Sequence, residues 1–215
     1  MDFPVTEAVR GREMIVDTCM HLSSDDTETY PPCGATVPYF QHGGPDPNKN
    51  ASPEHLRRCM RAQAVPVDRA MNFCNGWYGW DNSLAMDLLQ GNDDWLACGV
   101  LLDPASPSSP DELRRLVAAG ASALRIQPVV TGRPLDDPAA TPLWQAAAEL
   151  GIAVDVNLAQ NEYEQVARRA KEFPSVPIIV DHCGWLVGRS FPTAPGFSLE
   201  SVRNVDSPLI LSIFY

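Results

Sequence analysis

Residues 95–128 read WLACGVLLDPASPSSPDELRRLVAAGASALRIQP, and this stretch decides the fold. It begins with a nearly continuous apolar run at 95–102, which is typical of a parallel strand covered on both faces. The Ser-Pro-Asp-Glu sequence at 109–112 has the early proline and acidic first turn of a helix start, and Gly120 ends that helix. A second strand-like segment follows at 121–128. The stretch therefore predicts one strand–helix–strand unit.

The same alternation extends along the chain in both directions. The predicted strands lie at residues 14–22, 67–74, 95–102, 121–128, 152–158, 176–180 and 208–214. The predicted helices lie at residues 52–64, 81–90, 109–120, 141–151, 162–173 and 198–205. Such alternation predicts an α/β protein with a parallel sheet and right-handed crossovers. About seven strands fit either an open doubly wound sheet or most of an eight-stranded barrel. Because a full barrel typically takes about 250 residues, a barrel of 215 residues would lack its last unit.

The composition narrows the class of function. A hydrophobic fraction of 45% and a charged fraction of 20% are ordinary for a soluble globular protein. The net charge of −11 disfavours nucleic acid and anionic membranes as partners and leaves a small-molecule substrate as the expectation. No apolar run approaches the ~20 residues of a membrane span, and the N-terminus does not read as a secretory signal. The 6 cysteines form no Cys-x-x-Cys pair. A reducing, cytoplasmic location is expected.

Polar residues gather at the carboxyl ends of the predicted strands, where parallel α/β proteins place their functional groups. They are Asp17, Cys19, His21, Arg125, Gln127, Asp155, Asn157, Asp181 and His182. Asp17, Cys19 and His21 share one face of their strand, because strand side chains alternate with period two. Histidine and thiolate suit zinc, and carboxylates complete or orient such a site. Trp77, in the aromatic stretch after strand 67–74, could wall a pocket or pack on the surface.

Four segments resemble the amidohydrolase-related family. Residues 15–22, IVDTCMHL, resemble its first-strand motif, in which two histidines flank one residue. Residues 98–127 are similar to its third strand, Asp-Pro turn, helix and Gly-x-x-x-x-Arg strand. Residues 142–151 and 180–184 are similar to its fourth helix and its sixth-strand Asp-His-x-Gly. The resemblance implies one domain over residues 1–215 with an incomplete (β/α)8 TIM-barrel fold.

The Pro- and Gly-rich residues 23–52 have no periodicity and predict a long loop. Loops of this length in compact domains are often active-site covers. We therefore expect residues 23–52 to lie over the carboxyl-edge face of the barrel.

The resemblance also implies a metal site in altered form. In the family, two first-strand histidines, a fifth-strand histidine and an eighth-strand aspartate bind a divalent metal. His21 is then a retained ligand, and His182, with Asp181 beside it, is a retained acid–base or electrophilic group. Cys19 stands where the first histidine is expected, so it is either a thiolate ligand or a buried thiol. Asn157 replaces the fifth-strand histidine. The expected metal is zinc, unless these changes have abolished binding.

Two functions remain open from the sequence. The first is a metal-dependent hydrolase or decarboxylase that acts on a small carboxylated or cyclic substrate, with Arg125, Gln127, Asn157 and Trp77 binding that substrate. Arg125 could pair a carboxylate through two parallel hydrogen bonds or form a structural ion pair with an inward-facing aspartate. The second is a truncated, inactive barrel that serves as a binding protein and forms a homo-oligomer through an exposed sheet edge.

Overall fold

The computed structural model describes residues 14–33, 52–63, 66–74, 76–158, 163–181 and 209–211. These residues contain one sheet, whose strands are β1 (Val16–Met20), β2 (Arg69–Phe73), β3 (Leu96–Leu101), β4 (Ala123–Ile126), β5 (Ala153–Val156), β6 (Ile178–Val180) and β7 (Leu209–Leu211). Each strand pairs in parallel with the next one along the chain. A doubly wound sheet reverses its strand order at a switch point, whereas a barrel does not. The sheet is therefore an incomplete (β/α)8 barrel, as predicted.

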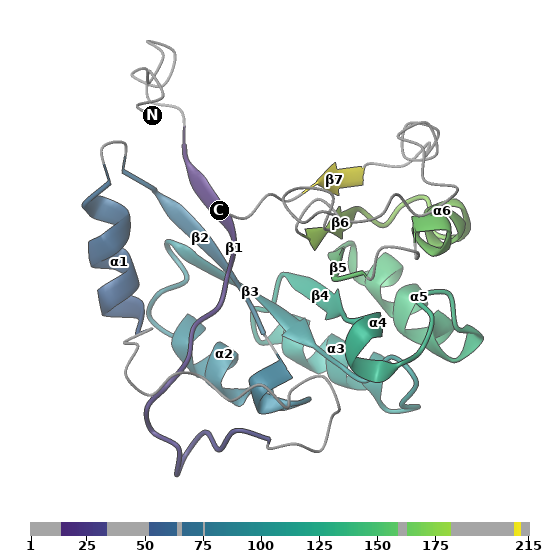
Figure 1. Ribbon diagram of the computed structural model, residues 1–215, viewed down its shortest axis with the longest axis horizontal. Helices are drawn as coiled ribbons and strands as arrows, with labels where there is room; N and C mark the ends of the chain where they lie inside the picture. The colour runs from purple at the N-terminus through teal and green to yellow at the C-terminus, as the bar shows by residue number, and fades with distance from the viewer. Residues whose placement is uncertain are drawn as a thin grey trace, which may run out of the picture.

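Helices surround the outside of the curled sheet (Figure 1). They are α1 (Pro53–Arg61), α2 (Ser83–Leu89), α3 (Ser109–Ala118), α5 (Thr141–Leu150) and α6 (Tyr163–Glu172). The sequence did not predict the short helix α4 (Pro128–Thr131) or the 3-10 turns η4 (Gly76–Tyr78) and η5 (Pro138–Ala140). The predicted helix at 198–205 lies outside the described residues. No helix within the described ranges is long and apolar enough to cross a membrane.

The helix ends follow the local sequence. Ser52 begins α1, because its Oγ accepts a hydrogen bond from the backbone N–H of His55 at 3.3 Å and Pro53 occupies the first turn. Gly151 ends α5 with φ of 66°, a left-handed conformation that glycine adopts without steric cost. Capping residues thus set both boundaries where the sequence placed them.

The main core lies between the sheet and the helices. Outward-facing strand residues such as Val100, Leu124 and Val154 are 0% exposed and pack against α3, α5 and α6. A second cluster fills the space around α1 and α2 with residues including Met60 and Leu89. These side chains alternate along each strand with inward-facing ones, so the sheet has a second face turned into the barrel.

The inward face is packed more sparsely with apolar residues than the outward face. Its small hydrophobic cluster contains Cys19, Phe73 and Ala123. Phe73 on β2 packs directly against Gly99 on β3. A Cβ atom added at Gly99 would lie 2.3 Å from two carbons of the Phe73 ring. Gly99 is therefore required by the ring and not by a turn, and it lets Phe73 reach the barrel interior.

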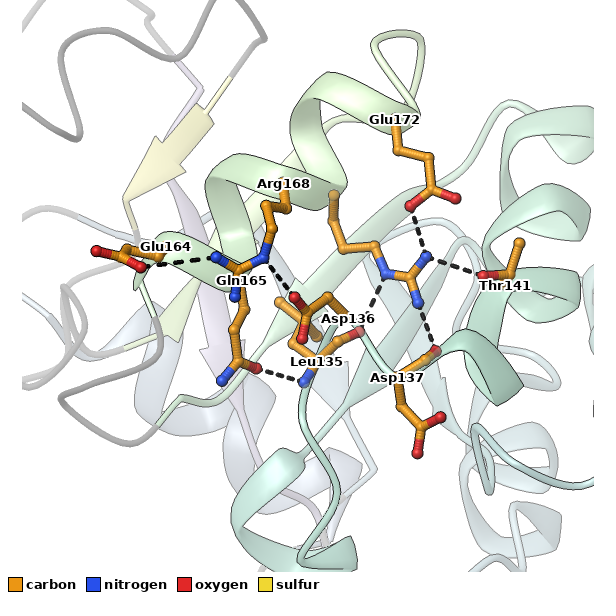
Figure 2. Close-up of polar contacts among 9 residues, drawn as sticks. Leu135, Asp136, Asp137, Thr141, Glu164, Gln165, Arg168 and Glu172 are labelled. Carbon is orange, nitrogen blue, oxygen red and sulfur yellow. Dashed lines mark hydrogen bonds and ion pairs between the residues drawn. The ribbon is translucent and has the colours of Figure 1, made fainter.

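Arg169 on α6 joins the outer helices to the connection that follows α4. Its guanidinium donates to the carbonyl oxygens of Leu135 at 3.1 Å and Asp137 at 2.7 Å, to Thr141 Oγ1 at 3.1 Å and to Glu172 at 2.8 Å. Figure 2 shows these contacts converging on the one guanidinium.

Two aromatic rings lie beside the Arg169 guanidinium, and Gln165 on the same helix binds the same connection. The Trp144 and Phe173 ring centroids lie 5.6 and 5.8 Å from the Arg169 guanidinium carbon. Gln165 accepts from the backbone N–H of Leu135 at 2.6 Å (Figure 2). The Arg169 side chain is 1% exposed, and each of its three guanidinium nitrogens donates at least one hydrogen bond.

The Phe73–Gly99 packing predicts that Gly99→Ala destabilises the protein. The added methyl group forces the Phe73 ring to move, and overpacking of this kind lowers the free energy of unfolding by about 2 kcal/mol. Chemical denaturation followed by circular dichroism would measure it. Adding Phe73→Leu to Gly99→Ala should recover part of the loss, whereas a Gly99→Ala protein as stable as the wild type would contradict the packing.

The Arg169 contacts predict that Arg169→Met lowers the free energy of unfolding by about 3 kcal/mol, because the variant leaves buried carbonyl oxygens without donors. Arg168→Met is the matched control on the same helix. Arg168 pairs with Asp136 and Glu164 but is 55% exposed, so its loss should cost less than about 1 kcal/mol. Equal denaturation midpoints for the two variants would show that Arg169 does not fasten the helices.

Candidate functional site

The sheet register brings inward-facing polar residues together at the carboxyl ends of the strands. Arg125 on β4 lies beside Asp155 on β5, and Asp155 lies beside Ile179 on β6. Asp181 follows β6 directly and points to the same side as Ile179, because side chains two apart share a face. All three charged side chains are almost completely buried, with 1%, 0% and 0% exposure for Arg125, Asp155 and Asp181.

The Arg125 guanidinium is the centre of this group. Its Nε lies 3.4 Å from a carboxylate oxygen of Asp155, and its Nη2 donates to Asp181 in a very short ion pair. Its Nη1 lies 3.8 Å from the sulfur of Cys19 on β1. The Phe73 ring centroid is 5.4 Å from the guanidinium carbon. The ion pair with inward-facing aspartates, one of the two roles considered for Arg125, is thus present.

Two carboxylates share this one buried cation. Burial raises the pKa of Asp155 well above its ordinary value, and the neighbouring Asp181 adds to the rise while Arg125 opposes it. Among the residues that the structure describes, none donates a hydrogen bond to either oxygen of Asp155 or to Oδ1 of Asp181 when both groups are carboxylates. A proton on Asp155 provides a donor to Asp181 and makes the group of three side chains electrically neutral.

His21, just after β1, is hydrogen-bonded to the backbone of β2. Its Nδ1 lies 2.8 Å from the backbone carbonyl oxygen of Phe73. A carbonyl only accepts, so Nδ1 carries a proton. Histidines that bind metals commonly donate a ring N–H to a backbone carbonyl in this way. The Nδ1 hydrogen bond of His21 is therefore of a kind that metal-ligating histidines also make.

Cys19 occupies a less favourable position for a ligand. Its side chain is 5% exposed. Burial, followed by the Asp181 carboxylate, raises the pKa of this thiol, so the protonated form is stable there. The nearest cation is the guanidinium of Arg125. Across the part of the chain that the structure describes, no three His, Cys, Asp or Glu side chains gather as a metal site. The described residues do not by themselves fit a divalent metal.

The other expected site residues are distributed as follows. Gln127 and Asn157 directly follow β4 and β5 and are 5% and 8% exposed. Gln127 Oε1 has no hydrogen-bond partner within the described ranges. Trp77 lies in η4 after β2, and its carbonyl oxygen accepts from the Cys33 N–H at 2.8 Å. His182 lies outside the described residues.

Part of the long loop reaches this edge of the sheet. The N–H of Ser24 donates to the Tyr78 hydroxyl at 3.1 Å, and Cys33 contacts η4 as above. Residues 34–51 lie outside the described part of the chain, so coverage of the site by the whole loop stays a prediction.

Two residues of this interior were missed in the sequence, Phe73 and Gly99. Glycine inside an otherwise apolar strand often marks a close approach of another group, and this signal was present in residues 95–102. A cavity of about 480 Å³ lies elsewhere, at the amino ends of β3 and β4, where Leu96 and Ser122 help to line it. Its position opposite the polar strand ends separates it from the candidate site.

Comparison with solved structures supports the fold. A probable 2-pyrone-4,6-dicarboxylic acid hydrolase from Acinetobacter baumannii, with citric acid bound, is 16% identical with a TM-score of 0.65, over 80% of this chain and 59% of that one. The 5-carboxyvanillate decarboxylase from Novosphingobium aromaticivorans, complexed with manganese and a nitrobenzoic acid, is 17% identical with a TM-score of 0.58, over 80% and 66%. An amidohydrolase from Burkholderia multivorans with bound zinc is 17% identical with a TM-score of 0.55, over 80% and 58%.

At these identities the three structures show the fold alone. The chain spans about three fifths of the length of the first of them, 59%. None of the curated proteins matches. The sequence model of one family, described as amidohydrolase, matches residues 16–198, which include β1 to β6 and every described polar residue of the inward face. The chain belongs to the amidohydrolase family.

Proposed function

We propose that this chain is an amidohydrolase-family enzyme that hydrolyses or decarboxylates a small carboxylated or cyclic substrate with the help of a divalent metal. The observation that carries the proposal is the orientation of His21, whose Nδ1–H is held by the Phe73 carbonyl oxygen at 2.8 Å. The substrate class is supported by the relatives, one a dicarboxylic acid hydrolase with bound citric acid and another a carboxyvanillate decarboxylase.

The metal is proposed on similar grounds. Two of the relatives hold manganese and zinc. His21 and Cys19 would supply two of the three protein ligands that a catalytic site normally has. Cys19 would have to lose its proton on binding, which its burial opposes. His21 is therefore favoured as the main protein ligand, with Cys19 as a weak or absent one.

The remaining site residues are proposed to handle the substrate and its protons. The side-chain amides of Gln127 and Asn157 stand at the carboxyl edge, where they can donate to a carboxylate or carbonyl oxygen. Trp77, after β2, would provide an apolar wall. His182 would transfer a proton. The neighbouring Asp181 would be held in position by its ion pair with Arg125. Arg125 can bind a substrate carboxylate only with N–H groups that the two aspartates do not take.

A second candidate function is a catalytically inactive barrel that binds another protein chain. The observation in its favour is the exposed start of β1, an edge strand in which Val16 is 43% exposed, next to Met14 at 59%. Exposed edges invite pairing with another chain. A stable oligomer without turnover would support this candidate, whereas a monomer in light scattering would oppose it.

The metal proposal predicts that the protein, purified without chelators, holds close to one divalent metal ion per chain. The His21→Ala variant should lose this ion. The reason is the loss of the main proposed protein ligand. Elemental mass spectrometry would measure the metal, and a screen of lactones and aromatic carboxylates would measure turnover, which should fall at least about 100-fold in His21→Ala. His55→Ala, on the outer helix α1, is the control and should keep both. Unchanged metal content and turnover in His21→Ala would contradict the proposal.

The buried aspartate predicts a specific pH dependence of stability. Because burial raises the pKa of Asp155, the folded protein keeps this proton at pH values where the unfolded chain has released it. The resulting stabilisation is full below the ordinary pKa of aspartate and is lost as the pH rises through the folded-state pKa. In Asp155→Asn the amide replaces the protonated carboxyl, so the free energy of unfolding should decline less between pH 4 and pH 8 than in the wild type.

Denaturant titrations at several pH values would measure this difference. The control is Asp93→Asn, since Asp93 is exposed and its substitution should leave the wild-type pH profile unchanged. An Asp155→Asn profile that parallels the wild type would show that Asp155 is ionised in the folded protein.

A further inference from the structure

Helix α1 carries a histidine and a cysteine one turn apart. His55 and Cys59 are four residues apart, a spacing that brings side chains together on one helix face. The distance from His55 Nε2 to Cys59 Sγ is 3.4 Å, and the Cys59 side chain is partly exposed. Helix α1 lies outside the sheet (Figure 1), so this pair is separate from the inward-facing polar residues.

A third residue determines where the imidazole proton lies. Arg58 Nη2 is 3.1 Å from His55 Nδ1. A guanidinium group can only donate hydrogen bonds, so Nδ1 accepts and the neutral ring carries its proton on Nε2. That proton points to the sulfur of Cys59. The sulfur is therefore the acceptor in this pair.

The other described cysteines have different surroundings. Burial raises the pKa of Cys74 to about 12 and that of Cys98 to about 11, and it raises the pKa of Cys19 as well. These three thiols stay protonated at neutral pH. The Cys33 thiol donates to the carbonyl oxygen of Gly76 at 3.3 Å. Cys59 differs from all four because its sulfur accepts from an imidazole.

The helix is also locally basic in an acidic protein. Its sequence PEHLRRCMR places Arg57, Arg58 and Arg61 around Cys59, although the whole chain has a net charge of −11. Arg57 is occupied by Asp94 at 3.4 Å and by the Trp95 ring. Positive side chains beside a thiol attract anionic reagents to it.

We propose that Cys59 is a site of reversible thiol–disulfide exchange with small anionic disulfides, assisted by His55 and Arg58. The Cys59 thiol gives its proton to solvent, and the thiolate attacks one sulfur of the incoming disulfide. A new S–S bond forms to Cys59 while the original S–S bond breaks, and the other half leaves as a thiolate that takes up a proton. The incoming disulfide is the oxidant and its departing half is the reduced product. The reaction reverses with excess small thiol.

The test treats the reduced full chain with oxidised glutathione at neutral pH and follows each cysteine by peptide mass spectrometry. Cys59 should form the mixed disulfide at least about tenfold faster than Cys33 in the folded protein. His55→Ala should slow the reaction at Cys59 about tenfold, since the N–H donor to sulfur is lost. Arg58→Gln should slow it more than Arg61→Gln, which removes an equal charge without the contact to His55. Circular dichroism of each variant would confirm that α1 is intact.

Three results would overturn the proposal. They are equal rates at Cys59 and Cys33 in the folded wild type, an unchanged Cys59 rate in folded His55→Ala, and an adduct that excess thiol does not release. Because α1 is remote from the inward face, the modified protein should keep the metal content and turnover of the unmodified protein. A failure here is therefore distinguishable from a failure of the proposed enzyme activity.

Discussion

The buried guanidinium of Arg125 is the contact on which the inward face of the sheet depends. From β4 it contacts side chains of β1, β5 and the end of β6, and it lies over the Phe73 ring from β2. A buried charge is tolerated only when it is paired and hydrogen-bonded. Removal of Asp181 would leave an uncompensated cation, and removal of the arginine would leave two carboxyl groups facing each other. The strands are thus held from the inside by charge as well as from the outside by apolar packing.

The same interaction shapes the chemistry available at the carboxyl edge. It uses Asp155 and Asp181 for structure, so neither carboxylate is available to ligate a metal unless Arg125 moves. His21 donates its Nδ1 proton to the Phe73 carbonyl oxygen at this edge, and the buried Gln127 and Asn157 follow β4 and β5 there.

Much of the secondary structure could be predicted from the sequence, whereas the strand order and the contacts between strands could not. The spacing of apolar residues predicted the strands and helices, and residues at helix ends such as Ser52 and Gly151 marked where helices begin and end. Both signals are local in the sequence. Strand order was ambiguous, because a barrel and a doubly wound sheet share the same local pattern. The sequence placed Arg125 and Asp155 at the carboxyl ends of two strands, but only the β4–β5 register made them neighbours. The short helix α4 was missed because only 4 residues form it.

Arg169 has a consequence for how the molecule opens. The connection between α4 and α5 has little regular structure, and such segments ordinarily exchange their amide protons and admit proteases first. Here its carbonyl oxygens at Leu135 and Asp137 are bonded to a buried side chain of α6. Opening that connection therefore breaks two hydrogen bonds to a guanidinium that also lies over the Trp144 and Phe173 rings. The half of the barrel from β4 to α6 should behave as one cooperative unit, in which a surface connection is as protected from solvent as the helices it joins.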